Sequence, residues 1–131
     1  MRSPSTDNRF VNWNTILLAA LILAVFLALK RLGLISRRAA LQHLQGGAVV
    51  VDVRSNREFQ SHHLPAAVNV PLDQLHHLAP RQFPDHSRVL LLHCLSGTRS
   101  SLARRTLRQM GYSNVYNLGS YGRARRIIAS Q

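Results

Sequence analysis

Four short segments of this chain are apolar almost without interruption, and they limit the possible folds more than any other feature. They cover residues 48–53, 67–70, 89–93 and 115–118. A strand with one face in water alternates apolar and polar side chains, whereas a strand of a parallel sheet covered on both faces does not. Helical patterns lie between these segments at about residues 55–61, 72–79 and 99–110, with a short one after Ser36 and a basic one at about 122–129. This alternation predicts an α/β fold, a parallel sheet with helices on both faces.

The N-terminal part of the chain has a different composition. Residues 1–12 form a polar tail, and residues 16–29 then run without a charged side chain. Trp13 before the run and Lys30 and Arg31 after it are typical flanks of a membrane-embedded helix. We therefore predict one transmembrane helix, or anchor, over residues 13–35 and the folded domain over residues 36–131.

The orientation of this anchor follows from the charges beside it. Cations are more numerous on the C-terminal flank, which predicts a single-pass membrane protein with its domain facing the cytoplasm. A signal peptide has a similar apolar run, so the sequence leaves open whether the segment is retained or cleaved.

The chain is strongly basic, with 17 Lys and Arg against 5 Asp and Glu and a formal net charge of +12. Such a charge attracts nucleic acid, anionic lipid or a small anionic substrate. The four Phe, three Tyr and one Trp are scattered rather than interleaved with arginines, which argues against nucleic acid as a partner. We expect a basic rim that serves docking or substrate attraction, and its members are Arg104, Arg105, Arg108, Arg123, Arg125 and Arg126.

Cys94 is the only cysteine of the chain, which excludes an intrachain disulfide and a zinc site built from several cysteines. Ligand spacings such as H-E-x-x-H are missing from the sequence, so we predict neither a metal nor a cofactor. The cysteine directly follows the third apolar segment, and ligands of open α/β sheets bind at the carboxyl ends of strands.

The residues after Cys94 indicate a reactive thiol. Gly97 lets the backbone amides of residues 95–100 converge above the sulfur, while Arg99 and the start of the next helix add positive charge. This environment favours the thiolate and binds an anion. A packed, inert thiol is the alternative.

The segment from Cys94 to Ser100 reads C-x-x-G-x-R-S and resembles the active-site loop of the rhodanese sulfurtransferases. Residues 52–71 resemble the first signature of that family, and residues 107–119 resemble its last helix-to-strand turn, so the resemblance covers about residues 36–122. It implies a single rhodanese-like domain. In the implied reaction, the Cys94 thiolate takes sulfane sulfur from thiosulfate or another persulfide donor, keeps it as a persulfide, and passes it to a thiophilic acceptor that could be a protein.

The resemblance also implies roles for the loop. Backbone amides of residues 95–99 would stabilise the persulfide anion, and Arg99 would orient the anionic donor. From spacing alone we expect an Arg54–Glu58 pair across a helical turn, and Asp52 as an acceptor of hydrogen bonds from loop or helix amides. The predicted site comprises the nucleophile Cys94, the loop residues Leu95, Ser96, Gly97, Thr98, Arg99 and Ser100, and the supporting residues Asp52, Arg54 and Glu58.

Other functions stay open at this point. Phosphatases of the same fold use a C-x5-R loop, and the shorter C-x4-R spacing here favours sulfur transfer, although the His93-Cys94 pair resembles the start of the phosphatase motif. A phosphatase or arsenate reductase is therefore the less favoured enzyme. The second reading is a membrane-tethered sulfur-carrier or partner-binding module with little turnover. His62, Ala66 and Ser120 stand where the family often has glycine, which leaves the backbone at two turns open.

Overall fold

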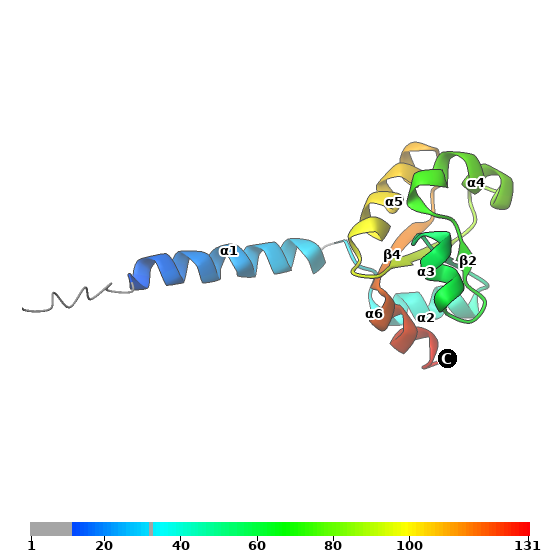
Figure 1. The fold of residues 1–131 in the computed structure, drawn as a ribbon. Coiled ribbons are helices and arrows are strands. Elements are labelled where there is room, and N and C mark those ends of the chain that lie inside the picture. The colour runs from blue at the N-terminus through cyan, green and yellow to red at the C-terminus, as the bar shows by residue number, and fades with distance from the viewer. Residues whose placement is uncertain (1–11, 32) are drawn as a thin grey trace, which may run out of the picture. The chain divides into compact units, whose positions relative to one another are not determined.

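The structure is a computed structural model that describes residues 12–31 and 33–131, so most of the predicted polar tail over residues 1–12 lies outside the described residues. The chain divides into two compact units, Met1–Leu32 and Gly33–Gln131. The first contains helix α1 (Trp13–Arg31) (Figure 1). The large apolar side chains between Trp13 and Leu27 on this helix are exposed. In the part of the chain that the structure describes, no helix combines the length and the apolar character needed to cross a membrane. The predicted transmembrane helix over residues 13–35 is therefore not supported.

The end of that predicted segment belongs to the folded domain instead. Leu34 forms a parallel bridge with Asn117, and the Ile35 N–H donates to the Asn117 carbonyl at 3.0 Å. Ile35 is buried in the domain core. These two apolar residues find their partners at a sheet edge, which explains why their hydropathy alone misplaced them in the helix.

The second unit contains the predicted sheet. Its strands are β1 (Val49–Asp52), β2 (Val68–Asn69), β3 (Leu90–Cys94) and β4 (Val115–Ser120). They are parallel and lie in the order β2-β1-β3-β4. The predicted parallel α/β sheet is thus confirmed. The central strands β1 and β3 place Asp52, the last residue of β1, beside His93, the residue before the end of β3.

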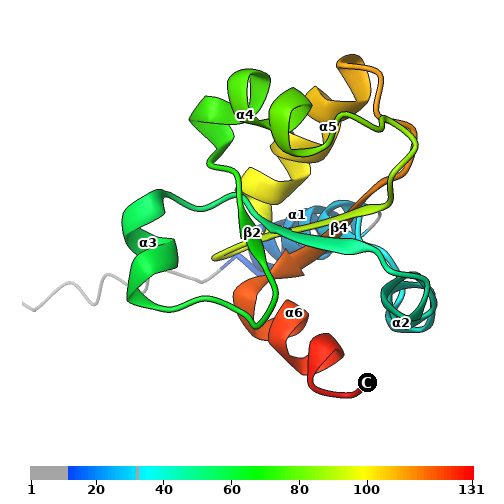
Figure 2. The same ribbon diagram turned by 90° about the vertical axis from the view of Figure 1, so that its right-hand side faces the viewer.

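Helices cover both faces of this sheet, as Figures 1 and 2 show. One face packs against α4 (Leu75–Gln82) and α5 (Thr98–Gln109) through a core that includes Leu92 and Leu107. The other face packs against α2 (Arg37–Gln45) and α6 (Tyr121–Ile128) through a core that includes Leu91 and Ile127. The short elements α3 (Asn56–Ser61) and η1 (Leu72–Gln74) lie in the connections that follow β1 and β2.

Burial on both faces explains the uninterrupted apolar runs, because every residue of β3 is buried. Consecutive residues of a strand point to opposite faces. Leu90, Leu92 and Cys94 therefore belong to the core under α4 and α5, whereas Leu91 belongs to the other core. This alternation places the Cys94 thiol on the α5 side of the sheet and the His93 ring on the α6 side.

Candidate active site

The loop between β3 and α5 surrounds the Cys94 sulfur. Gly97 has a φ of +95° and is the N-cap of α5, a backbone conformation that residues with a Cβ rarely adopt. A Cβ at this position would lie 3.3 Å from the backbone of Gly119 on β4. The turn directs the Gly97 N–H to the Cys94 sulfur at 3.0 Å. Glycine is thus required both for the turn and for the close approach of the two chain segments.

The Cys94 side chain has 0% exposure. Burial raises the pKa of the thiol, but hydrogen bonds from the backbone amides of Ser100, Gly97 and Ser96 and from the Ser100 hydroxyl outweigh this effect, so that the pKa is lowered overall. Donors that converge on the sulfur stabilise its anionic form. The sequence predicted this geometry for the amides, whereas Leu95 and Thr98 are exposed on the outside of the loop.

Arg99 does not extend freely over the loop, because its guanidinium is held by Glu58. Both terminal nitrogens donate to the carboxylate, at 2.7 and 2.9 Å. Glu58 also accepts hydrogen bonds from Ser55 in the capping box that begins α3. The Arg99 hydrogen bonds hold the pKa of Glu58 at about 2, against burial that acts in the opposite direction. Conversely, Glu58 foremost and also Cys94 raise the pKa of Arg99, which indicates that the guanidinium charge acts at the sulfur.

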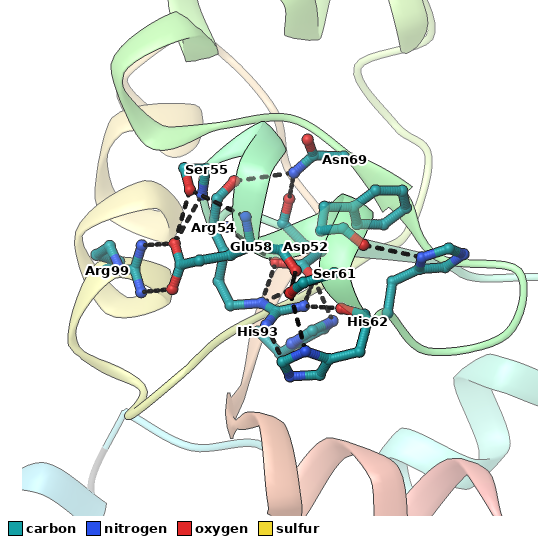
Figure 3. Close-up of polar contacts among 11 residues, drawn as sticks. Asp52, Arg54, Ser55, Glu58, Ser61, His62, Asn69, His93 and Arg99 are labelled. Atoms are coloured by element: carbon teal, nitrogen blue, oxygen red, sulfur yellow. Dashed lines mark hydrogen bonds and ion pairs between the residues drawn. The ribbon is translucent and has the colours of Figure 1, made fainter.

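The expected Arg54–Glu58 pair is wrong, because Arg54 turns into the protein and pairs with Asp52. The two side chains are buried, and their closest contact is 2.7 Å. Asp52 also accepts from the Arg54 backbone N–H at 2.9 Å, so its expected role as an acceptor of amide hydrogen bonds is partly realised. Figure 3 shows this pair beside the separate Glu58–Arg99 pair. The one-turn spacing between Arg54 and Glu58 therefore suggested the wrong partner. A buried guanidinium needs a charged partner that is buried with it, and Asp52 provides one.

The Arg54 guanidinium also organises the segment after α3. It donates to the His62 carbonyl at 2.8 Å and lies over the Tyr121 ring, 4.8 Å from its centroid. The Asn69 side-chain amide donates to the carbonyls of Asp52 and Arg54, each at 2.9 Å, and joins β2 to the end of β1. Together these contacts fix the framework on which Glu58 is carried.

His93 lies on the far side of the sheet from the thiol. Its Nε2 is 3.7 Å from Asp52, and neither ring nitrogen has a hydrogen-bond partner among the described residues. Burial lowers the pKa of this histidine despite the nearby carboxylate, so the contact with Asp52 is not an ion pair near neutral pH. The His93-Cys94 pair resembled the start of the phosphatase motif in sequence, but the two side chains lie on opposite faces of the sheet.

The departures from glycine at the turns have a visible consequence at Ala66, whose φ is +58°. This residue occupies the left-handed region although it carries a Cβ, which costs about 1 kcal/mol or more relative to glycine. His62 caps the end of α3 in extended backbone, and Ser120 caps the start of α6 with its side chain. Of these three positions, only Ala66 therefore has a positive φ, whereas His62 and Ser120 have negative ones.

Half of the predicted basic rim is engaged in structural contacts. Arg104 and Arg108 both donate to the Val115 carbonyl, at 3.2 and 3.4 Å. Arg123 donates to the Leu118 carbonyl at 2.6 Å. The remaining members, which are exposed, are Arg105, Arg125 and Arg126.

Sequence reasoning missed Asn117 and Gly119. The Asn117 side chain is almost fully buried on β4 and contacts both Ser100 and Gly119. A buried asparagine inside an apolar strand is the signal that could have identified it, because buried polar side chains need hydrogen-bond partners. No group of three His, Cys, Asp or Glu side chains within residues 12–31 and 33–131 is placed to hold a metal ion.

Comparison with known proteins identifies the family. The family model for the rhodanese-like domain matches residues 36–122. The thiosulfate sulfurtransferase PspE of Escherichia coli is 32% identical over 69 residues, which are 53% of this chain and 66% of that protein. The thiosulfate:glutathione sulfurtransferase of Saccharomyces cerevisiae is 35% identical over 78 residues, which are 51% of this chain and 56% of that protein.

A solved structure agrees with these relatives. The human single-domain sulfurtransferase TSTD1 superposes with a TM-score of 0.61 and 26% identity, over 70% of this chain and 94% of that one. The matched segments span less than two thirds of the length of the two curated relatives. The family model nevertheless covers the whole sheet and the cysteine loop, and the chain belongs to the rhodanese-like domain family.

Proposed function

We propose that the protein is a rhodanese-type sulfurtransferase that carries sulfane sulfur as a persulfide on Cys94. The observation that supports this most directly is the position of the sulfur, 3.0 Å from the Gly97 N–H and under a loop that lowers the pKa of the thiol. A thiolate is the nucleophile that attacks sulfur. Relatives named thiosulfate sulfurtransferases support a small anionic donor such as thiosulfate or a persulfide.

The reaction is a double displacement. The Cys94 thiolate attacks the outer sulfur of thiosulfate, a new S–S bond forms, and the S–S bond of the donor breaks with its electron pair leaving on sulfite. A nucleophile such as cyanide or a thiol then attacks the outer sulfur of the persulfide, and the electron pair of that S–S bond returns to Cys94. Each displacement leaves negative charge beside the loop, where the amides of Ser96, Gly97 and Ser100 stabilise it.

Arg99 and Glu58 act together in this scheme. Because Glu58 occupies both terminal nitrogens of Arg99, the arginine attracts the anionic donor by its charge rather than by a free two-pronged grip. The pair also ties the end of the loop to α3, and Cys94 and Arg99 are separated by the short C-x4-R spacing. This spacing favours sulfur over the tetrahedral phosphate of a phosphatase.

A sulfur-carrier module with little turnover is the second candidate. A putative sulfur carrier protein of Bacillus subtilis is 30% identical over 69 residues, which supports it. In that case the donor or acceptor is a docked protein. The exposed Leu95, adjacent to the nucleophile, would then contact the partner.

Intact mass of the full chain in mild detergent separates the two candidates. After incubation with thiosulfate, a gain of one sulfur atom is expected on the wild type and is lost in Cys94→Ala, because Cys94 is the only cysteine. Thiocyanate formation on addition of cyanide then measures turnover. Turnover supports the enzyme and an adduct without turnover the carrier, whereas a wild-type chain that gains no sulfur from thiosulfate or a persulfide donor would refute both.

We further propose that helix α1 (Trp13–Arg31) attaches the protein to a membrane, with the rhodanese-like domain on the cytoplasmic side. The support is the exposed apolar surface of α1, including Trp13 at 75% exposure, and the cations that follow it. A cysteine introduced at Ser5 in a Cys94→Ser background tests the orientation by labelling of intact cells and of inverted vesicles. Labelling from the cytoplasmic side refutes the proposed orientation, and recovery of the chain in the soluble fraction refutes attachment.

A further inference from the structure

The Ser100 hydroxyl lies between two possible acceptors. It is 2.8 Å from Asn117 Oδ1 and 3.7 Å from the Cys94 sulfur. Its carbonyl neighbours, Gly97 at 3.1 Å and Gly119 at 3.5 Å, are less favourable than Asn117 by distance. A serine hydroxyl has one proton to donate. With an uncharged thiol, that proton is therefore directed to Asn117.

Asn117 is held so that its oxygen must face Ser100. The register between β3 and β4 shifts between Leu92 and His93, and at this bulge the Gly119 N–H donates to Asn117 Oδ1 at 2.8 Å. Because a backbone N–H can only donate, the atom that receives it is the amide oxygen. The Asn117 backbone is paired with Leu92 on one side and bridged to Leu34 on the other. Asn117 is 3% exposed, so water does not compete for the oxygen.

The charge on sulfur changes the balance between the two acceptors. A hydrogen bond to a charged acceptor is stronger than one between neutral groups, and Ser100 is fully buried, where such differences are large. When Cys94 becomes a thiolate, rotation about a single serine torsion moves the proton from Asn117 toward the sulfur. Gly119 still donates to the amide oxygen, so Asn117 keeps a partner throughout.

We propose that Asn117 is a positioning residue for sulfur transfer, which holds the Ser100 hydroxyl beside Cys94 and releases it to the sulfur as that atom becomes charged. The inference deepens the proposed function and rests on it. Asn117 competes with the sulfur for one proton, and the strength of that competition sets how readily the thiolate forms.

Two substitutions at Asn117 are expected to shift the pKa of Cys94 in opposite directions. Asn117→Ala removes the competing acceptor, so Ser100 is free to donate to sulfur and the pKa of Cys94 falls by about half a unit to one unit. Asn117→Asp has nearly the same shape but accepts the proton more strongly, so the pKa of Cys94 rises by at least a similar amount. The ultraviolet absorbance of the thiolate against pH measures both, because the chain has one cysteine.

The same substitutions in a Ser100→Ala background identify the route of the effect. If Asn117 acts through Ser100, the Asn117→Ala change in the pKa of Cys94 disappears there, and the Asn117→Asp change falls to the charge repulsion alone. Asn114→Ala is the matched control, since Asn114 directly precedes β4 and its side chain donates to the Ser87 carbonyl instead. It is expected to leave the pKa of Cys94 unchanged.

Several results would overturn the inference. Asn117 would be a purely structural residue if its substitutions changed the pKa of Cys94 equally with and without Ser100. The same conclusion would follow if Asn117→Ala and Asn117→Asp shifted that pKa in the same direction. If Asn117→Ala does not fold, the comparison of Asn117→Asp with and without Ser100 decides alone. The persulfide assay on the wild type is independent of these pKa values. If the persulfide forms but the pKa of Cys94 does not respond to the Asn117 substitutions as expected, the role of Asn117 is refuted. If no persulfide forms, the proposed function is refuted.

Discussion

Replacing Glu58 by glutamine tests whether the Glu58–Arg99 pair stabilises the domain. The pKa of Glu58 changes from 4.5 to about 2 on folding, which for a buried group would correspond to about 3 kcal/mol. The two side chains are 32% and 36% exposed, and solvent screening reduces the value to about 1–2 kcal/mol. Glutamine keeps the shape and one oxygen for Ser55, so this loss reports mainly on the contact with Arg99.

The pH dependence gives the prediction its sharpest form. Because the folded pKa of Glu58 lies below the unfolded one, the stabilisation is complete above about pH 4.5 and is lost as the pH falls toward 2. Glu58→Gln should therefore lower the free energy of unfolding at pH 7 by about 1–2 kcal/mol and by much less near pH 2–3. Urea unfolding of the full chain at both pH values measures this.

The structure determines which spectroscopic probe follows unfolding of the domain and which variant serves as the control. The only tryptophan, Trp13, lies in α1, so far-ultraviolet circular dichroism or tyrosine fluorescence reports better on the domain. Asp73→Asn removes an exposed carboxylate on η1 and serves as the control. A Glu58→Gln variant as stable as the wild type at pH 7, or equally destabilised at both pH values, would refute the electrostatic reasoning.

Three further predictions concern the framework of the site. Gly119→Ala should lower the free energy of unfolding, measured in urea titrations, by about 1–3 kcal/mol, because φ is +90° and the new Cβ would lie 2.9 Å from Leu34 Cδ2. Adding Leu34→Ala removes the steric contact and should restore only part of this loss. Full restoration would refute the argument from the backbone conformation. Arg54→Met should lower the free energy of unfolding, measured by heat or urea, by about 3–5 kcal/mol, because it leaves Asp52 buried without its partner. The double variant Asp52→Asn/Arg54→Met should be destabilised less than Arg54→Met, and equal destabilisation would contradict this reason. Gly97→Ala should raise the pKa of Cys94 by moving the Gly97 N–H away from the sulfur, and an unchanged thiolate titration in a folded variant would contradict this.

Several features of the fold could be predicted because they depend on local pattern. The uninterrupted apolar runs indicated buried parallel strands, and all of β3 is buried. Ser36 was expected to begin a helix, and its side chain accepts from the Ala39 N–H at the start of α2. The cysteine at the end of a strand, followed by a glycine, predicted a loop of amides around the sulfur, and the Gly97 N–H lies where that reasoning placed it.

The N-terminal segment shows the limit of hydropathy as a guide. Leu34 and Ile35 continue the apolar run of α1, but they pack on the edge of β4 and in the domain core. Hydropathy measures how strongly a side chain avoids water and does not identify which apolar surface covers it. The edge of β4 provided that surface, together with backbone partners for residues 34 and 35.

The sequence by itself determined the parallel α/β fold, the place of Cys94 at the end of a strand, and the short loop that follows it, because these depend on residue types within a few positions of one another. Tertiary structure decided the partners of the charged and polar groups around the site. Glu58 meets Arg99 across 41 residues and Ser100 meets Asn117 across 17, while Arg54 turns to Asp52. The strand order β2-β1-β3-β4 brings these groups to one edge of the sheet. Which donor then contacts which acceptor depends on the distance between them and on their burial in the folded protein. The spacing of such distant residues along the sequence gives neither quantity.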